Sequence, residues 1–313
     1  MGRQGIRSAW ADVPPTVRSA MDALLGSEVA TTQEVSGGFS PGPAVRADLE
    51  DGRSVFIKAA GRHPNELSPM MHRREAAVLD LLPPAVPAAR LLGTVDDGDW
   101  VALAIEWVDG RMPAADDPDD VGRLLDLLRR VAEAPQGGEL THLEPLAVTH
   151  PDLWGHWTEL AAEPHPDLDG WSRRHLDRLA ELDAQAPAAT VGSHLLHVDV
   201  RTDNVVLAHA APSADVLVDW PGASLGAPWV DLVALLPALH LDGGPPPSAV
   251  MEGSPLARAA DPGAIDTFVV ALAGYFTRSS LLPAPPGLPT LRPFQAAQGA
   301  IARDWSAQRL QLR

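Results

Sequence analysis

The first third of the chain alternates short apolar runs with turn residues. Apolar and polar positions alternate on both sides of Asp51-Gly52, a dipeptide that is a strong hairpin signal. Apolar residues at helical spacing mark two further segments, and Pro83-Pro84 stops the second of them. Residues 1–107 therefore predict a small antiparallel sheet with one inserted helix. The predicted helices are 11–27 and 65–82, and the predicted strands are 29–35, 44–49, 55–59, 89–95 and 100–107.

The rest of the chain has a mostly helical pattern, interrupted by a strand-rich stretch at 194–219. Proline-rich stretches at 243–247 and 283–289 predict connecting loops. A length of 313 residues is long for one core and favours two lobes, which we place at 1–107 and 108–313. The predicted helices of this part are 121–134, 171–185, 229–241, 263–279 and 290–309.

Composition narrows the class of protein. No run of 18 apolar residues is present, so we expect no membrane span, and the absence of cysteine excludes disulfides and thiolate chemistry. The N-terminus lacks the apolar stretch of a signal peptide, and we expect a cytoplasmic protein. The net charge of −17 argues against a nucleic-acid partner and permits a cationic one, although acidic surfaces also serve solubility alone.

The segment His197–Asn204 carries the strongest chemical pattern. It precedes the apolar residues 205–207, and Asp219 follows fifteen residues after Asn204. A strand, a turn and a second strand would bring Asn204 and Asp219 to the same end of a hairpin. Their side-chain oxygens suit a hard ion such as Mg²⁺, which also holds substrate phosphates. Asp199 would then lie on the far side of the metal and face an incoming hydroxyl.

This spacing matches the protein-kinase catalytic loop, H-x-D-x-x-x-x-N followed by a metal-binding Asp. Only two asparagines occur in the chain, so an Asn at the required offset is improbable by chance. The His-x-Asp triplets at His150 and His165 have Trp157 and Ser172 at that offset and fail the pattern. Taken singly, each residue also fits a turn or a cap, and we interpret Asp203 in that way.

Two features of the first lobe fit the same chemistry. The loop Ser36-Gly37-Gly38-Phe39-Ser40 lies between two predicted strands and suits a phosphate-covering loop, although it lacks the full G-x-G-x-x-G and also fits an ordinary hairpin. Lys58 is the only lysine beside 23 arginines and lies on the third predicted strand, with Glu75 in the following helix. A compact ammonium can be held in a tight pocket by a carboxylate, whereas a guanidinium fork would not fit there. The alternative is that Lys58 survived by chance.

Together these residues resemble the aminoglycoside phosphotransferase and choline kinase superfamily over nearly the whole chain. The resemblance rests on 36–40, 55–58, the segment 74–79, the linker 105–110, the motif 197–204 and the stretches 218–220 and 226–232. It implies an α+β, bilobal, protein-kinase-like fold with a small antiparallel-sheet lobe and a larger helical lobe. Asp-Trp replaces Asp-Phe-Gly and no Ala-Pro-Glu segment is present, so protein substrates are not expected.

The resemblance implies two cofactors, ATP and Mg²⁺. Lys58 would contact the α- and β-phosphates with Glu75 fixing it, and the backbone of Glu106 and Val108 would bind the adenine edge. The implied cofactor-binding residues are Gly37, Gly38, Ser40, Lys58, Glu75, Glu106 and Val108.

The resemblance also implies roles around the catalytic loop. Asp199 would be the catalytic base or the group that orients the hydroxyl, and Asn204 and Asp219 would hold the metal. Asp231, at the start of a helix, would brace the loop, and His197 would be structural. The function implied is ATP-dependent phosphorylation of a hydroxyl on a small molecule, with antibiotic resistance among the outcomes. A catalytically silent nucleotide-binding relative is the alternative, and four intact residues argue against it.

The acceptor is less defined than the catalytic core. Residues 109–183 contain 17 Asp and Glu against 7 Arg, a net charge of −10, which could steer a cationic acceptor such as an aminoglycoside. The same acids also fit solvated helix ends, and homoserine, choline, an amino sugar or a peptide antibiotic suits the same core. We interpret His150, Asp152 and His156 as packing and loop rather than a metal site. Three tryptophans could line an acceptor pocket or belong to the core: Trp154, Trp157 and Trp171.

Overall fold

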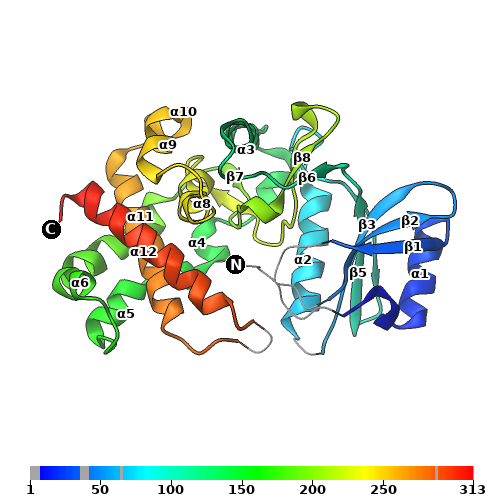
Figure 1. Ribbon diagram of the computed structural model, residues 1–313, viewed down its shortest axis with the longest axis horizontal. Helices are drawn as coiled ribbons and strands as arrows, with labels where there is room; N and C mark the ends of the chain where they lie inside the picture. Colours follow the sequence, from blue (N-terminus) through cyan, green and yellow to red (C-terminus); the bar gives the residue numbers. More distant parts are fainter. Residues whose placement is uncertain (1–7, 36–41, 64–65, 286–287, 313) are drawn as a thin grey trace. The chain divides into compact units, whose positions relative to one another are not determined.

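The structure is a computed structural model that describes residues 8–35, 42–63, 66–285 and 288–312. Its described residues form two compact units (Figure 1). The first comprises those within Met1–Met112, Asp203–Pro221 and Pro286–Leu288, and the second those within Pro113–Thr202, Gly222–Pro285 and Pro289–Arg313. No helix in the described ranges is long and apolar enough to cross a membrane. The functional lobes 1–107 and 108–313 stay a prediction.

The first unit is built on a five-stranded antiparallel sheet in the order β1-β2-β3-β5-β4. The turn at Asp51-Gly52 joins β2 to β3, and Gly52 takes a φ of 88°, a conformation that glycine adopts without steric cost. The predicted strands are confirmed to within two residues at each end. They are β1 (Val29–Glu34), β2 (Ala44–Leu49), β3 (Ser54–Gly61), β4 (Leu91–Asp96) and β5 (Trp100–Glu106).

Two helices contact this sheet, α1 (Pro15–Leu25) and α2 (Leu67–Leu81) (Figure 1). In β3 the side chains of Val55, Ile57 and Ala59 enter a core with residues of α1, because alternate residues of a strand point to one face. Lys58 lies between them and therefore points to the other face, where α2 packs. The alternation of β3 thus directs Lys58 to the face of the sheet on which α2 packs.

A second small sheet in the first unit consists of a hairpin and one added strand. Strands β8 (Val205–Ala208) and β9 (Val216–Leu217) pair antiparallel, as predicted, and β6 (Gly110–Arg111) pairs with β8. A Cβ on Gly110 would lie 2.5 Å from the carbonyl oxygen of Leu207, so the close approach of β6 to β8 requires glycine. This sheet brings Asp203–Pro221, a segment that begins 91 residues after Met112, into the first unit.

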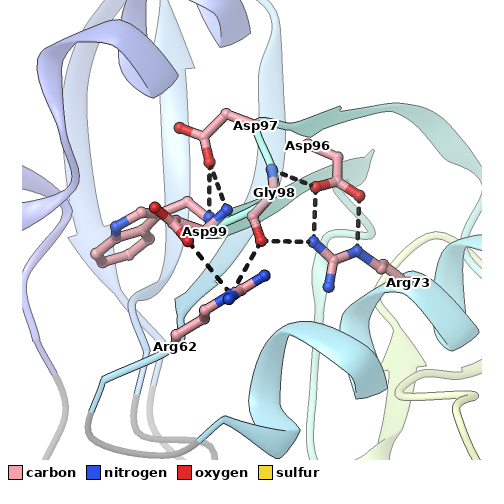
Figure 2. A network of polar contacts seen from close by, with 7 residues as sticks. Arg62, Arg73, Asp96, Asp97, Gly98 and Asp99 are labelled. Atoms are coloured by element: carbon pink, nitrogen blue, oxygen red, sulfur yellow. Dashed lines mark hydrogen bonds and ion pairs between the residues drawn. The ribbon is translucent and has the colours of Figure 1, made fainter.

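The turn between β4 and β5 is tied to α2 by a network of charged side chains (Figure 2). Arg73 of α2 donates from Nε and Nη2 to the two carboxylate oxygens of Asp96, both at 2.7 Å, and from Nη2 to the carbonyl of Gly98 at 3.1 Å. Gly98 has a φ of 95° in this turn. Arg73 lies two residues before Glu75, so these contacts with the β4–β5 turn hold the part of α2 that carries Glu75.

The second unit is mostly helical, which confirms the α+β fold class. Its core packs Trp157 and Leu160 against residues of α6, α11 and α12. Strands β7 (His194–Leu196) and β10 (Ser224–Gly226) form an antiparallel pair. The helices are α3 (Pro118–Ala132), α4 (Leu146–Thr149), α5 (His156–Ala162), α6 (Gly170–Asp183), α7 (Ala186–Ala189), α8 (Val230–Leu241), α9 (Pro247–Gly253), α10 (Pro255–Arg258), α11 (Pro262–Ser280) and α12 (Leu291–Leu310), and the 3-10 turns of the chain are η1 (Trp10–Asp12), η2 (Gly138–His142), η3 (Pro151–Leu153), η4 (Thr202–Asn204) and η5 (Pro212–Ala214).

Some boundaries differ from the sequence prediction. Helix α3 begins at Pro118 rather than 121, because Asp117 caps it by accepting a hydrogen bond from the backbone N–H of Asp119 at 2.9 Å. The interpretation of His150, Asp152 and His156 as packing and loop was wrong in part, since Asp152 lies in η3 and α5 begins at His156. The short helices α4, α7, α9 and α10 span too few residues to show a helical period, and none was predicted.

The Arg73–Asp96 pair should make a small, pH-dependent contribution to stability. The hydrogen bonds from Arg73 lower the pKa of Asp96 to about 2, below the ordinary value of about 3.9. We expect Asp96→Asn to cost about 0.2–1 kcal/mol at pH 7, because the pair is largely exposed. This difference should be present above about pH 4 and shrink as the pH falls toward 2.

Urea unfolding of wild type and variant between pH 3 and 7 measures this effect. Asp99→Asn is the matched control, because Asp99 pairs with Arg62 at 3.3 Å with both side chains more than half exposed. A loss in Asp96→Asn that does not change with pH would contradict the assignment.

Candidate functional site

A pocket with a volume of about 380 Å³, within the range of small-molecule sites, lies in the first unit. Apolar side chains form much of its wall, among them Leu79, Ala89 and Ile105. Its polar members come from β3, α2, the end of β5, β6, η4 and the segment after β9. They are Lys58, Glu75, Glu106, Arg111, Asp203, Asn204 and Asp219.

The ammonium group of Lys58 lies between two carboxylates. Its Nζ donates to Asp219 Oδ1 at 2.8 Å and forms an ion pair with Glu75. Glu75 is almost completely buried and also accepts a hydrogen bond from the backbone N–H of Trp220. The ammonium nitrogen of Lys58 in β3 therefore contacts the next element, α2, and a segment far away in sequence, the one after β9.

Burial and charge act in opposite directions on these groups. Burial alone would lower the pKa of Lys58, but the carboxylates of Asp219 and Glu75 outweigh it, and the pKa is raised above its usual value. Burial raises the pKa of Glu75 to about 7, against the lowering effect of Lys58. Lys58 therefore stays charged, whereas Glu75 is the member of the cluster that titrates near neutral pH.

The β8–β9 hairpin brings Asn204 and Asp219 to the same end, as predicted. Val205 pairs with Leu217, and the backbone N–H of Val218 donates to the carbonyl of Asn204 at 3.0 Å. Asp219 has a φ of 70°, unusual for a residue other than glycine and typical of functional sites. Its side chain is 40% exposed, so the carboxylate stays accessible to solvent although Oδ1 pairs with the buried ammonium of Lys58.

The donor atoms of this hairpin fit Mg²⁺. The amide oxygen of Asn204 and the carboxylate of Asp219 are hard oxygen ligands, and Mg²⁺ usually takes few protein ligands and keeps water and phosphate oxygens. Within the described ranges, no group of three or more His, Asp and Glu side chains could hold a metal ion. The cluster of His150, Asp152 and His156, interpreted as packing, is no exception, since both imidazoles bond to backbone carbonyls.

The segment after β5 borders the apolar part of the pocket. The backbone N–H of Glu106 donates to the carbonyl of Arg90 at 2.8 Å, so a contact with a base would use the carbonyl of Glu106. Val108 also lines the pocket. Between them, the ring of Trp107 carries the guanidinium of Arg46 at 5.3 Å from its centroid, a cation–π contact that holds the indole in place.

Asp199 lies in the second unit, on a loop held by Asp231. The carboxylate of Asp231 accepts from the backbone N–H of His197 at 2.7 Å and from that of Val198 at 2.9 Å. This confirms that Asp231 braces the loop. Burial raises the pKa of Asp231, although these bonds and His197 oppose the shift. Asp199 itself is half-exposed and pairs with Arg201 at 2.7 Å.

The loop is also strained. Val198 has a φ of 71°, which is a genuine outlier for a β-branched residue. The two bonds to Asp231 hold the backbone in this conformation, with Asp199 as the next residue. Strain of this kind persists only where the surroundings over-determine it, and it concentrates at functional sites.

The structure brings most of the predicted residues together. Gly37, Gly38 and Ser40 lie outside the described residues. Asp199 lies in the second unit. One pocket of the first unit is lined by Lys58, Glu75, Glu106, Val108, Asn204 and Asp219.

Three functional candidates were not identified from the sequence. Asp203, interpreted there as a turn residue, lies in η4 and also lines the pocket. Arg201 pairs with Asp199, a contact that its spacing of two residues does not indicate. His72 lies three residues before Glu75 on the buried face of α2. This spacing places both side chains on one face of a helix and could have identified His72 from the sequence. Burial and the charge of Lys58 lower the pKa of His72 to about 3.

Asp231→Asn should destabilise the loop. An amide can accept only one of the two backbone hydrogen bonds and points its NH₂ group at the other N–H. We expect a loss of about 1–3 kcal/mol in the free energy of unfolding, measured by urea titration. Asp177→Asn, on the exposed face of α6, should change stability little. Equal losses in both variants would contradict the bracing role.

Comparison with known proteins agrees with this architecture. The profile of the phosphotransferase enzyme family matches residues 31–305. No curated protein matches the sequence.

Solved structures share the fold at low identity. A thermostable mutant of an aminoglycoside phosphotransferase, in complex with ADP and hygromycin B, has a TM-score of 0.60 and 14% identity, over 92% of this chain and 98% of that one. An aminoglycoside-3'-phosphotransferase of type VIII has a TM-score of 0.55 and 24% identity, over 84% and 100%. An aminoglycoside phosphotransferase from Alicyclobacillus acidocaldarius has a TM-score of 0.53 and 16% identity, over 96% of both chains. With a family match that covers most of its length, the chain belongs to the phosphotransferase enzyme family.

Proposed function

We propose that the protein transfers the γ-phosphate of ATP to a hydroxyl group of a small molecule. The observation that carries this proposal is the cluster of Lys58, Glu75 and Asp219 beside Asn204, in a pocket of about 380 Å³. Phosphoryl transfer is catalysed chiefly by positioning and by neutralisation of charge, and this pocket contains the groups for both.

The first unit would hold the nucleotide. The apolar wall near Ile105 and Val108 suits a flat base, with the carbonyl of Glu106 at its edge. Lys58 would contact the α- and β-phosphates, and Glu75 would keep its ammonium in place when Asp219 turns to other ligands. Asn204 and Asp219 would hold Mg²⁺, which, when bound, neutralises phosphate charge.

The second unit would supply the group that prepares the acceptor. Asp199 is half-exposed, so a hydroxyl can donate to its carboxylate. Arg201 holds Oδ1 of this carboxylate, which orients it. The bonds from His197 and Val198 to Asp231 fix the backbone that carries it.

We propose a cationic acceptor, although part of its support has a structural explanation. Some of the acids that give residues 109–183 their charge stabilise helices: Asp117 caps α3, and Asp169 caps α6 by accepting from two backbone N–H groups. Others are exposed and available for steering, including Glu144 and Asp152. Structural relatives include enzymes named for aminoglycosides and a putative fructosamine-3-kinase from Haemophilus somnus with a TM-score of 0.54.

A panel of hydroxylated compounds with Mg·ATP tests the function. We expect acceptor-dependent release of ADP with one or more of kanamycin, hygromycin B, a fructosamine, homoserine and choline, and a rise in melting temperature with Mg·ATP alone. Asp199→Ala should keep that rise and reduce turnover by at least about 100-fold. Binding of nucleotide without turnover on any acceptor would favour a silent nucleotide-binding protein. Turnover of neutral or acidic compounds only would contradict the cationic acceptor.

Lys58→Arg tests the single lysine. The charge remains, but a planar guanidinium cannot take the place of a compact ammonium between two carboxylates. We expect turnover to fall by about 100-fold while the protein remains folded by circular dichroism. Arg62→Lys, an exposed exchange in the reverse direction, is the control. Activity near wild type in Lys58→Arg would show that position 58 needs only a positive charge.

A further inference from the structure

A small pocket of about 40 Å³, partly open to its surroundings, lies in the second unit. Close-packed interiors contain few voids larger than one water molecule, and this volume equals roughly three water-sized positions. Its wall is apolar and rich in aromatic rings, with Trp154, Phe268 and Tyr275 among its members. Trp154 and Phe268 pack with ring centroids 6.2 Å apart, so two of these rings support each other.

The cavity adjoins the loop that carries Asp199. Val198, the strained residue immediately before Asp199, forms part of its wall. The wall also includes Ala234 of α8, the helix whose first turn contains Asp231. A void and a strained backbone each cost stability, and here both lie within one residue of the proposed catalytic group.

Two polar observations accompany the apolar wall. The indole N–H of Trp154 is buried and has no hydrogen-bond acceptor among the described residues. Such a donor costs free energy unless a ligand supplies the missing oxygen. The pKa of Tyr275 is raised by burial and then by the negative charges of Asp152 and Asp199, with Arg292 opposing them. A cationic group near this phenol would therefore be favoured.

We propose that this cavity is the part of the acceptor site that receives a small apolar substituent, such as a methyl group, carried next to the phosphorylated hydroxyl of an amine. The indole N–H of Trp154 donates to an oxygen of the same molecule. Asp152 and Asp199 attract its ammonium group. This assignment rests on the proposed function and narrows it, because a fully polar acceptor would leave the cavity empty.

Binding of two simple probes tests the assignment without turnover. Ethanolamine and 1-amino-2-propanol both carry an amine and a hydroxyl and differ by one methyl group. Their dissociation constants for the full chain are measured by saturation-transfer NMR. We expect 1-amino-2-propanol to bind roughly fourfold more tightly, the gain for one buried methyl. Equal affinities would overturn the proposal.

A variant of the cavity wall tests whether the preference for 1-amino-2-propanol arises in this cavity. Ala234→Val adds two methyl groups to the cavity and should abolish the preference for 1-amino-2-propanol, with a melting temperature at or above that of wild type. Retention of the preference would place the methyl group elsewhere and overturn the assignment.

Trp154→Phe removes the indole N–H and keeps an aromatic ring. It should weaken both probes by about 2- to 10-fold. Trp171→Phe is its matched control, because the indole N–H of Trp171 is also buried without an acceptor in the described part of the chain, yet Trp171 is not part of the cavity wall. Equal weakening in both variants would contradict the role of Trp154. Absence of phosphorylation on the acceptor panel would instead contradict the proposed function and leave these binding results standing.

Discussion

One buried ammonium group organises the first unit. Lys58 pairs with Glu75 and Asp219, and these three residues come from β3, α2 and the segment after β9. Removing one partner of such a buried pair costs about 3–5 kcal/mol, whereas replacing the whole group by apolar side chains is often neutral or stabilising. The cluster is therefore a poor device for stability alone. It is well suited to a site that must present a fixed positive charge and an available carboxylate in the same place.

A second buried carboxylate has the corresponding role in the second unit. Asp231 accepts two backbone N–H groups and holds Val198 in a left-handed conformation, with Asp199 as the next residue. Glu75 and Asp231 thus act alike: each lies at the buried face of a helix and fixes a group from another element. In both cases burial raises the pKa of the carboxyl, and hydrogen bonds or an ion pair oppose the shift. Burying the carboxyl groups of Glu75 and Asp231 costs free energy, which the surrounding packing offsets. The two buried groups in turn position the exposed carboxylates of Asp219 and Asp199.

Much of the candidate site was predictable from the spacing and periodicity of residues along the chain. The spacing between Asn204 and Asp219 predicted a hairpin that joins them, because two short strands and a turn allow little else. The period of two in β3 predicted which residues share a face with Lys58. His72 was not singled out and Asp203 was interpreted as a turn residue, because burial beside Lys58 and a place in the pocket wall arise from tertiary contacts. For the acids Asp117 and Asp169 the sequence left two readings open, steering charge or helix ends, and the structure shows that both residues cap helices.

By itself the sequence determined the longer elements and the family, and it predicted the chemistry of a catalytic core, because those depend on residue type, period and spacing along the chain. The tertiary structure decided which carboxylates surround Lys58, that Asp219 rather than Glu75 remains accessible, and that a cavity adjoins Val198. Burial and the direction of a side chain are properties of packing between segments far apart in sequence. A pattern along the chain specifies which face a residue occupies, and only the packed structure specifies what that face meets.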